Sequence, residues 1–150
     1  MPFNFRFEKI LKLKRRIEDE LKSELAALEL RKKNAAIEKE KLVRELESLR
    51  GEFSKRQQEG MSGGEIQLYL SLLSSLSFLI TRKEKEIKSL EKDIETKKRE
   101  IIEASKERKK FEKLKERNFE AYRYEEALKE RKILDEMGLN LFIRGERGGA

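Results

Sequence analysis

A seven-residue repeat of isoleucine and leucine runs through the second half of this sequence. Its first positions are Ile66, Leu73, Ile80, Ile87, Ile94 and Ile101. The positions three residues further on are Tyr69, Leu76, Lys83, Leu90, Lys97 and Ala104. A pair of this kind in every seven residues, over more than five repeats, is the pattern of a coiled-coil helix. The repeat restricts this part of the chain to a long helix that must cover one narrow apolar stripe, the seam, with a partner helix.

The first half of the chain carries a matching repeat. Its main series is Leu21, Leu28, Ala35, Leu42 and Leu49. The second series is Leu25, Leu46 and Phe53, interrupted by Lys32 and Lys39. Toward the N-terminus we expect the seam to continue through Ile17, Leu13 and Ile10. The spacing of four plus four between Ile17 and Leu25 predicts a stutter there, where a supercoil unwinds locally.

A group of glycines separates the two repeats. Gly60, Gly63 and Gly64 form the one strong central break in the chain. If the chain turns back at this break, the numbers of facing residues add up to 122, which places Leu21 opposite Ile101. The two seams then meet along their whole length in an intramolecular antiparallel coiled coil. The alternative is a parallel homodimer of one continuous helix, which would have to pass through all three glycines.

We therefore predict an all-α fold, a two-helix antiparallel coiled-coil hairpin that occupies residues 1–137. The helices are expected at residues 4–58 and 62–137, joined by a turn at residues 59–64. Residues 138–150 are expected to form a flexible tail.

Local signals accompany these limits. Ser62 followed by Glu65 has the spacing of a capping box at the start of a helix, and Gly138 stands where a helix commonly ends. The register also places Lys39 opposite Lys83 in the seam. This layer should be weak unless glutamates from flanking positions reach the two ammonium groups.

The composition excludes several classes of enzyme. The 150 residues include no cysteine and no histidine, which rules out a disulfide frame, a Cys/His zinc site, a thiol nucleophile and a histidine base. Charged residues make up 45% of the chain and hydrophobic residues only 37%, so a thick core with an enclosed pocket is not expected. We predict no catalytic residue, no metal site and no cofactor.

Neither a signal peptide nor a membrane span is expected. Phe3, Phe5 and Phe7 alternate with polar residues and lead directly into charged sequence. The longest uncharged run, residues 66–81, has 16 residues and includes four serines, which is short for a membrane span. We predict a cytoplasmic protein.

Positive charge is concentrated in two stretches. Residues 1–16 hold six basic side chains against one acidic, and residues 106–117 hold seven against three, in a chain with a net charge of +7. The hairpin register brings both stretches to the same end. Such a surface is either a solvated face that shields the seam or a contact for a polyanion or an acidic protein. Nucleic acid is not the expected partner, because interleaved glutamates repel phosphate and aromatic side chains for stacking are sparse.

The uncharged run contains more apolar side chains than two helices can cover. After the seam positions are assigned, those left over are Leu68, Leu70, Leu72, Phe78 and Leu79. They either thicken the seam or form an exposed patch. On an otherwise highly charged chain, we favour a patch that binds a partner.

Three segments of the chain resemble the FliJ family of bacterial flagellar proteins. They are a Phe-rich start leading into Ile-Leu-Lys-Leu-Lys at residues 10–14, Glu-Arg-Lys-Lys-Phe-Glu-Lys-Leu at residues 107–114, and Glu-Arg-Lys-Ile-Leu-Asp-Glu at residues 130–136. The resemblance covers nearly the whole chain in length and layout. Its most specific parts are the Phe-Glu-Lys-Leu string and the closing Asp-Glu pair.

The resemblance implies a non-catalytic stalk and chaperone of the flagellar type III protein export apparatus, similar to the central γ stalk of rotary ATPases. It implies three partners at the cytoplasmic face of the cell membrane: the export ATPase hexamer, the export gate membrane protein and export chaperones. The end with both termini would enter the ATPase ring, where the candidate residues are Arg15, Arg16, Arg108, Phe111, Lys113 and Leu114. A surface nearer the turn would contact the gate. Our candidates there come from the leftover apolar residues, not from a family motif, and are Leu68, Leu72, Phe78 and Leu79.

Two alternative functions stay open at this point. One is the equivalent stalk of a virulence type III secretion system, which the sequence does not distinguish from a flagellar one. The other is a basic coiled coil that binds nucleic acid or an acidic membrane. Tight binding with a steep dependence on salt would favour this second alternative.

Overall fold

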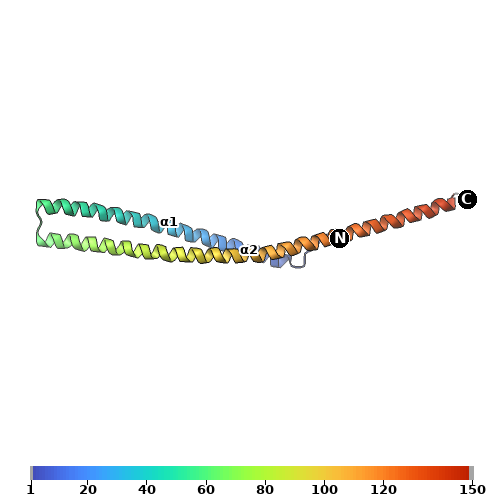
Figure 1. The fold of residues 1–150 in the computed structure, drawn as a ribbon, viewed down its shortest axis with the longest axis horizontal. Coiled ribbons are helices and arrows are strands. Elements are labelled where there is room, and N and C mark those ends of the chain that lie inside the picture. The colour runs from blue at the N-terminus through green and yellow to red at the C-terminus, as the bar shows by residue number, and fades with distance from the viewer. Residues whose placement is uncertain (1, 149–150) are drawn as a thin grey trace. The chain divides into compact units, whose positions relative to one another are not determined.

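The fold is all-α and consists of two long helices, as predicted. A computed structural model describes residues 2–148 of the chain. Helix α1 is Glu8–Glu59 and helix α2 is Gly63–Gly148. The two helices pack against each other as an antiparallel hairpin (Figure 1).

The chain divides into two compact units. The turn unit comprises residues 19–103, and the terminal unit comprises residues 1–18 together with residues 104–150. Each unit contains a stretch of α1 packed on a stretch of α2.

The seam of the turn unit agrees with the repeat in the sequence. Its most buried side chains are Ala35, Leu46, Tyr69, Leu90 and Ile94, all less than 9% exposed. Every other predicted apolar seam residue of this unit is at least half-buried, namely Leu21, Leu25, Leu28, Leu42, Leu49, Phe53, Ile66, Leu73, Leu76, Ile80, Ile87 and Ile101. The positions between them are mostly exposed and polar. Burial of a narrow aliphatic stripe is therefore the main apolar contribution to the packing of this unit.

One aromatic contact fixes the register of the turn unit. The ring centroids of Phe53 and Tyr69 are 5.4 Å apart, and these two numbers add up to 122. The Tyr69 hydroxyl donates a hydrogen bond of 3.1 Å to Glu52, which is one position along on the same helix as Phe53. The predicted pairing of α1 with α2 is thus confirmed at the end of the hairpin next to the turn.

The turn is shorter than predicted, because only residues 60–62 lie between the helices. Gly60 has a φ of 97°, a conformation that glycine adopts without the steric cost that other residues meet. Its N–H lies 3.4 Å from the Gln57 carbonyl oxygen and closes the last turn of α1. The Ser62 hydroxyl accepts a hydrogen bond of 3.2 Å from the Glu65 N–H, which is the N-cap that the spacing predicted.

At the N-terminal end, the predicted seam is wrong. Ile10, Leu13 and Ile17 are 39%, 50% and 38% exposed, whereas Leu11 is completely buried and Glu18 is only 4% exposed. The half-buried and buried positions of α1 continue with regular spacings of three and four, so no stutter occurs. The apolar pattern misled us because Glu18, a charged residue, occupies a seam position, paired with an arginine of α2.

Two helix limits also differ from the prediction. α1 begins at Glu8 rather than at residue 4, and α2 continues through Gly138 to Gly148 instead of ending at residue 137. Gly138 does not adopt the left-handed conformation that ends many helices. A glycine inside a helix costs only about 1 kcal/mol relative to alanine, which the helix-forming neighbours tolerate. The predicted flexibility of the tail stays a prediction, and residues 149–150 lie outside the described part of the chain.

Candidate functional site

The layer with two lysines in the turn unit is braced by glutamates from flanking positions. Lys39 Nζ lies 3.4 Å from Glu84 of the facing helix, and Lys83 pairs with Glu38 of the facing helix. Lys83 Nζ also lies 3.0 Å from Glu86, one turn away on its own helix. The hydrogen bond from Lys83 lowers the pKa of the Glu38 carboxyl, and the bonds to Glu38 and Glu86 raise the pKa of Lys83. The three glutamates thus offset the repulsion between the two ammonium groups.

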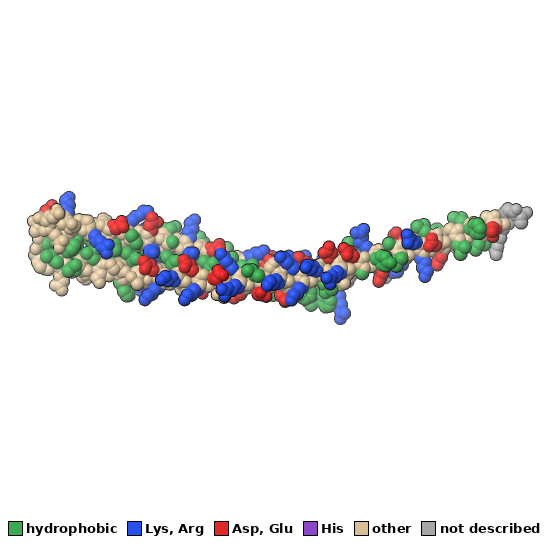
Figure 2. Space-filling view, viewed as in Figure 1, with side chains coloured by type: hydrophobic (Ala, Val, Ile, Leu, Met, Phe, Trp, Pro, Cys, Tyr) green, Lys and Arg blue, Asp and Glu red, His purple; other side chains and the backbone are tan. Residues whose placement is uncertain are grey.

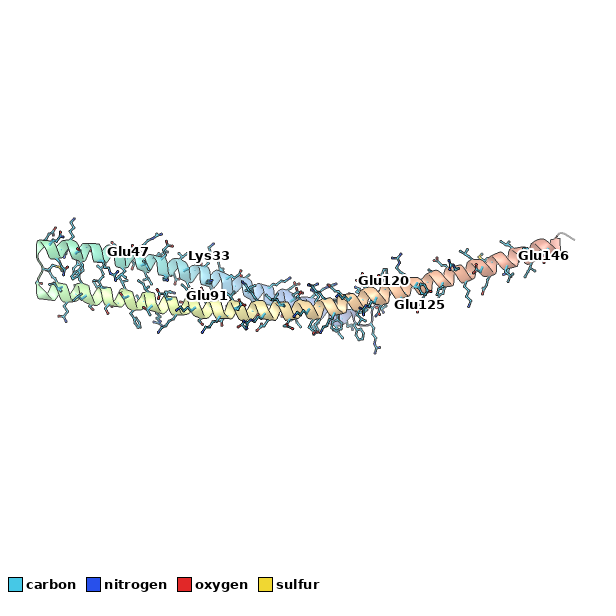
Figure 3. The ribbon with its side chains drawn as sticks, in the orientation of Figure 1. Lys33, Glu47, Glu91, Glu120, Glu125 and Glu146 are labelled. Carbon is cyan, nitrogen blue, oxygen red and sulfur yellow. The ribbon has the colours of Figure 1, made fainter. Side chains whose placement is uncertain are left out.

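Other lysines at seam positions follow the same rule. Lys97 Nζ lies 2.7 Å from Glu24 of α1 and 3.1 Å from Glu100, and these bonds raise its pKa. Lys32 Nζ lies 3.5 Å from Glu91, which Figure 3 labels on α2. Each of these lysines leaves its aliphatic stem along the seam and turns its ammonium group to a carboxylate at the edge. These pairs hold the helices in register and have no evident chemical task.

The terminal unit contains the most buried ion pair among the described residues. Arg108 Nε donates to Glu18, whose side chain is 5% exposed, and Arg108 Nη1 lies 2.9 Å from Glu112. Arg108 Nη2 lies 3.4 Å from the Ser105 hydroxyl. The bonds to Glu18 and Glu112 raise the pKa of Arg108, so its guanidinium stays charged across the physiological range. As a charged residue, Glu18 carries no apolar signal of a seam position. Only the regular continuation of the seam spacing could have found it.

A short aromatic segment covers α2 in the terminal unit. Residues 2–7 precede α1, and the Phe3 ring lies 5.2 Å from Phe119 and 5.5 Å from Tyr122 between centroids. The Phe7 ring lies 6.3 Å from Phe111, and Phe5 is only 5% exposed. These edge-on and tilted contacts bury apolar area that a two-helix seam would leave in water. The phenylalanines that argued against a signal peptide thus pack as a cap on α2.

The six candidates for the ATPase ring fall into two groups in the terminal unit. Arg15 lies 3.5 Å from Glu112, Arg108 is held by Glu18, and Phe111 packs on Phe7. Those three side chains are engaged within the unit. The other three are Arg16, Lys113 and Leu114. Arg16 and Lys113 are exposed and have no ion pair among residues 2–148, and Leu114 is half-buried.

The four candidates for the export gate are exposed in the turn unit. Leu68, Leu72, Phe78 and Leu79 are 59%, 45%, 66% and 41% exposed, and Leu70 beside them is 53% exposed. In Figure 2 the part of the turn unit nearest the turn shows mostly hydrophobic and uncharged atoms. The exposures indicate that these side chains do not thicken the seam into a core. Leu72 and Leu79 are the least exposed of the five.

By length and composition alone, the helix that contains this region is long and apolar enough to cross a membrane. The helical stretch Gly63–Glu146 includes 18 residues with a mean hydropathy of 1.2 and few charges, and 11% of that window is buried. Its Ile66, Leu73 and Ile80 are half-buried in the seam of the hairpin. A helix whose apolar side is partly used in this way has less apolar surface left for lipid.

Each unit has a surface pocket, and residues 2–148 contain no cluster of metal-binding side chains. No group of three or more His, Cys, Asp or Glu side chains there could hold a metal ion. A pocket of about 280 Å³ lies beside Leu42, Leu79 and Arg82. A second of about 460 Å³ lies beside Phe3, Arg15 and Phe119.

Comparison with known proteins gives a consistent result. Residues 3–147 match the family described as Flagellar FliJ protein. The Flagellar FliJ protein of Bacillus subtilis (strain 168) is 28% identical over 143 residues, which cover 95% of this chain and 97% of that protein. No solved structure matches the chain.

Proposed function

Because this chain belongs to the FliJ family of flagellar proteins, we propose that it is the non-catalytic stalk of a flagellar type III export apparatus. The match extends over nearly the whole chain, so both units belong to the family's layout. The observation that carries the proposal is a coiled-coil hairpin with two exposed surfaces of different chemistry. One surface is basic and the other is apolar and uncharged.

The export ATPase hexamer is the proposed partner of the terminal unit. Arg16 and Lys113 support this contact because they are exposed cations without an ion pair among the described residues. Arg15, Arg108 and Phe111 contribute indirectly, by holding α1, α2 and the N-terminal segment together. Charge at the edge of such a contact speeds association and weakens with salt.

The export gate membrane protein is the proposed partner of the turn unit. Leu68, Leu72, Phe78 and Leu79 support this contact as an apolar group that the hairpin leaves exposed. Exposed apolar groups on a charged protein usually mark a site for a partner. Export chaperones are the third proposed class of partner, and the protein would work at the cytoplasmic face of the membrane. No feature of the chain favours one of its surfaces for the chaperones.

The ring contact is tested by reversing its two free charges. We expect the double variant Arg16→Glu, Lys113→Glu to bind the export ATPase at least about tenfold more weakly and to stimulate its activity less. The control is Lys33→Glu, Arg44→Glu, which reverses two exposed cations of the turn unit. Equal binding by both variants would contradict the ring contact.

The gate contact is tested separately. Replacing Leu72, Phe78 and Leu79 by serine should weaken binding to the cytoplasmic part of the gate protein while leaving the helix content unchanged. A large fall in the melting temperature would instead show that these side chains stabilise the seam. Binding that survives the three substitutions would remove the gate contact from this patch.

A further inference from the structure

Three aliphatic side chains that the sequence pattern assigned to the seam lie outside it. Ile10, Leu13 and Ile17 are 39%, 50% and 38% exposed. Their spacing of three and four places them in one row along α1, within about 60° of one another around the helix axis. The seam itself uses Leu11, Lys14 and Glu18, so the row runs beside the seam and is not needed to close it.

The row lies on one particular flank of the terminal unit. The ion pair between Lys14 and Glu107, 4.0 Å apart, marks the flank of the seam on which Glu107 lies. By the seven-residue spacing, Leu114 lies on the same side of α2 as Glu107, and Ile10 and Ile17 border that flank on α1. The other flank is bridged instead by Arg15 with Glu112 and by Lys115 with Glu8, 2.9 Å apart. The first flank therefore has an apolar centre, Ile10, Leu13, Ile17 and half-buried Leu114.

Cations border this apolar centre on both helices. Lys9 and Arg16 follow the row on the outer side of α1, and Lys113 and Arg117 follow Leu114 on the outer side of α2. All four are exposed and have no ion pair among residues 2–148. The nearest carboxylate on this flank, Glu107, is already occupied by Lys14 and by Lys110 at 3.2 Å. The flank thus carries unneutralised positive charge along both edges of an apolar strip.

We propose that this flank is a docking site for an acidic amphipathic helix of a partner protein. Such a helix would lay an apolar row on Ile10, Leu13, Ile17 and Leu114 and place carboxylates against Lys9 and Arg16 on one edge and Lys113 and Arg117 on the other. A third helix beside two others completes a three-helix coiled coil, which covers the row that the hairpin leaves open. Complementary charge on both edges fixes the lateral position of the helix.

Other occupants fit this flank less well. A second copy of the chain would bring the same lysines and arginines against one another. An anionic membrane would need the apolar row to project furthest, whereas Ile10 and Ile17 lie next to the seam and the longer cationic side chains stand outside them. The acidic helix satisfies both the apolar strip and the charges.

This inference rests on the proposed function, because Arg16, Lys113 and Leu114 also belong to the proposed ring contact. It adds the apolar row of α1 and the kind of structure that binds it. The proposed ring contact is tested through the charges of Arg16 and Lys113 alone. The docking site needs charge together with an apolar row, and that difference decides the experiment.

The probe is a synthetic helical peptide about three heptads long, with leucines at seam spacing and glutamates on both edges. Two matched peptides carry serine in place of the leucines or lysine in place of the glutamates. Binding of each to the full-length chain is measured by fluorescence anisotropy at low and at physiological salt. We expect the acidic leucine peptide to bind at least about tenfold more tightly than either matched peptide.

Variants of the chain locate the binding. Replacing Ile10, Leu13 and Ile17 by serine should weaken peptide binding about tenfold or more, with the helix content unchanged. The control replaces Leu30 and Ile37 by serine, which are 58% and 44% exposed on the same helix but away from the basic stretches. Crosslinking of the bound peptide to residue 13 gives a second readout that does not depend on affinity.

Each result separates the two proposals. If the serine peptide binds as tightly as the leucine peptide, or if the control variant loses as much binding, the docking site is wrong, and reversal of Arg16 and Lys113 still tests the ring contact. Tight binding of vesicles rich in phosphatidylserine through the same row would contradict the acidic helix as the occupant and indicate a membrane surface instead. If reversal of Arg16 and Lys113 abolishes peptide binding but leaves ATPase binding normal, the docking site is supported and the ring contact at these two residues is contradicted.

Discussion

The two units of this protein hold the same pair of helices together in different ways. In the turn unit, the seam is an aliphatic stripe in which lysines occupy several positions and glutamates brace them from the edges. In the terminal unit, the seam includes the buried pair of Glu18 with Arg108, and an aromatic segment packs on α2. The comparison teaches that a regular spacing of buried positions does not require a regular chemistry at those positions.

The difference follows from where α1 begins. α1 starts at Glu8, which pairs with Lys115 of α2. The part of α2 that follows Lys115 therefore has no residue of α1 beside it. The three phenylalanines before α1 supply apolar area there, and α2 is exposed at every position from residue 127 to residue 146. A charged seam position and an aromatic cap therefore occur together in the unit where α2 continues beyond the first residue of α1.

The largest expected effect separates the two units by their cores. Leu11→Ala in the terminal unit and Leu90→Ala in the turn unit each remove a fully or nearly fully buried side chain, and each should cost about 2–5 kcal/mol of unfolding free energy. Hydrogen exchange should show the loss of protection mainly in the unit that carries the substitution. Leu128→Ala, at an exposed position, serves as the control and should change stability by less than about 0.5 kcal/mol. Equal loss of protection in both units would show that they unfold as one.

The next effect compares the charged positions of the two seams. Glu18→Gln should lower the melting temperature more than Glu38→Gln does, because Glu18 is buried and Glu38 has a side chain that is 56% exposed. Replacing both Glu18 and Arg108 by leucine should recover much of the loss, since no unpaired charge is then left in the seam. If Glu18→Gln melts like the unchanged protein, the pair adds no stability.

A smaller effect compares two glycines, Gly51 inside α1 and Gly60 directly after its end. Gly60→Ala should destabilise the hairpin by about 1–2 kcal/mol, because its φ of 97° is strained for residues with a side chain. Gly51→Ala, inside α1 with open space around it, should stabilise by about 0.5–1 kcal/mol. Chemical denaturation measures both changes. Stabilisation by Gly60→Ala would mean that the turn relaxes into another conformation.

The smallest effect is a loss of stability in acid. The folded state lowers the pKa of Glu38 in the turn unit and of Glu8 in the terminal unit, in both cases mainly through a hydrogen bond from lysine. These carboxylates therefore contribute stability above the ordinary pKa of 4.5, and the contribution is lost as the pH falls through their folded pKa values. Melting temperatures recorded from about pH 6 to about pH 3 should fall less steeply for Glu38→Gln than for the unchanged protein. An identical slope would show that Glu38 makes no net contribution.

The turn unit could be predicted from the sequence because its chemistry agrees with its spacing. Isoleucine and leucine recur at the seam positions, and the glycines lie at the centre of symmetry between the two repeats. Even the two facing lysines were identified with the condition for their stability, which Glu38 and Glu84 fulfil. Local signals and long-range pairing pointed to the same structure.

The terminal unit could not be predicted in the same way. Apolar residues at positions 10, 13 and 17 suggested a seam, while the true seam passes through Leu11, Lys14 and Glu18. A charged residue can be recognised as a seam residue only when its partner is known, and Arg108 lies 90 positions along the chain from Glu18. For the same reason, the sequence could not separate Arg15 and Arg108, which are bound within the unit, from Arg16 and Lys113, which have no ion pair among residues 2–148.

The braced lysines of the turn unit have a mechanical consequence. If α2 slid along α1 by one heptad, aliphatic side chains would still meet at most layers, but Lys39 would face Leu76 or Leu90 and move away from Glu84. The ion pairs therefore specify one register and oppose sliding, which a uniform leucine seam would not do. A hairpin with such pairs can transmit a push or a twist along residues 19–103 without one helix slipping past the other.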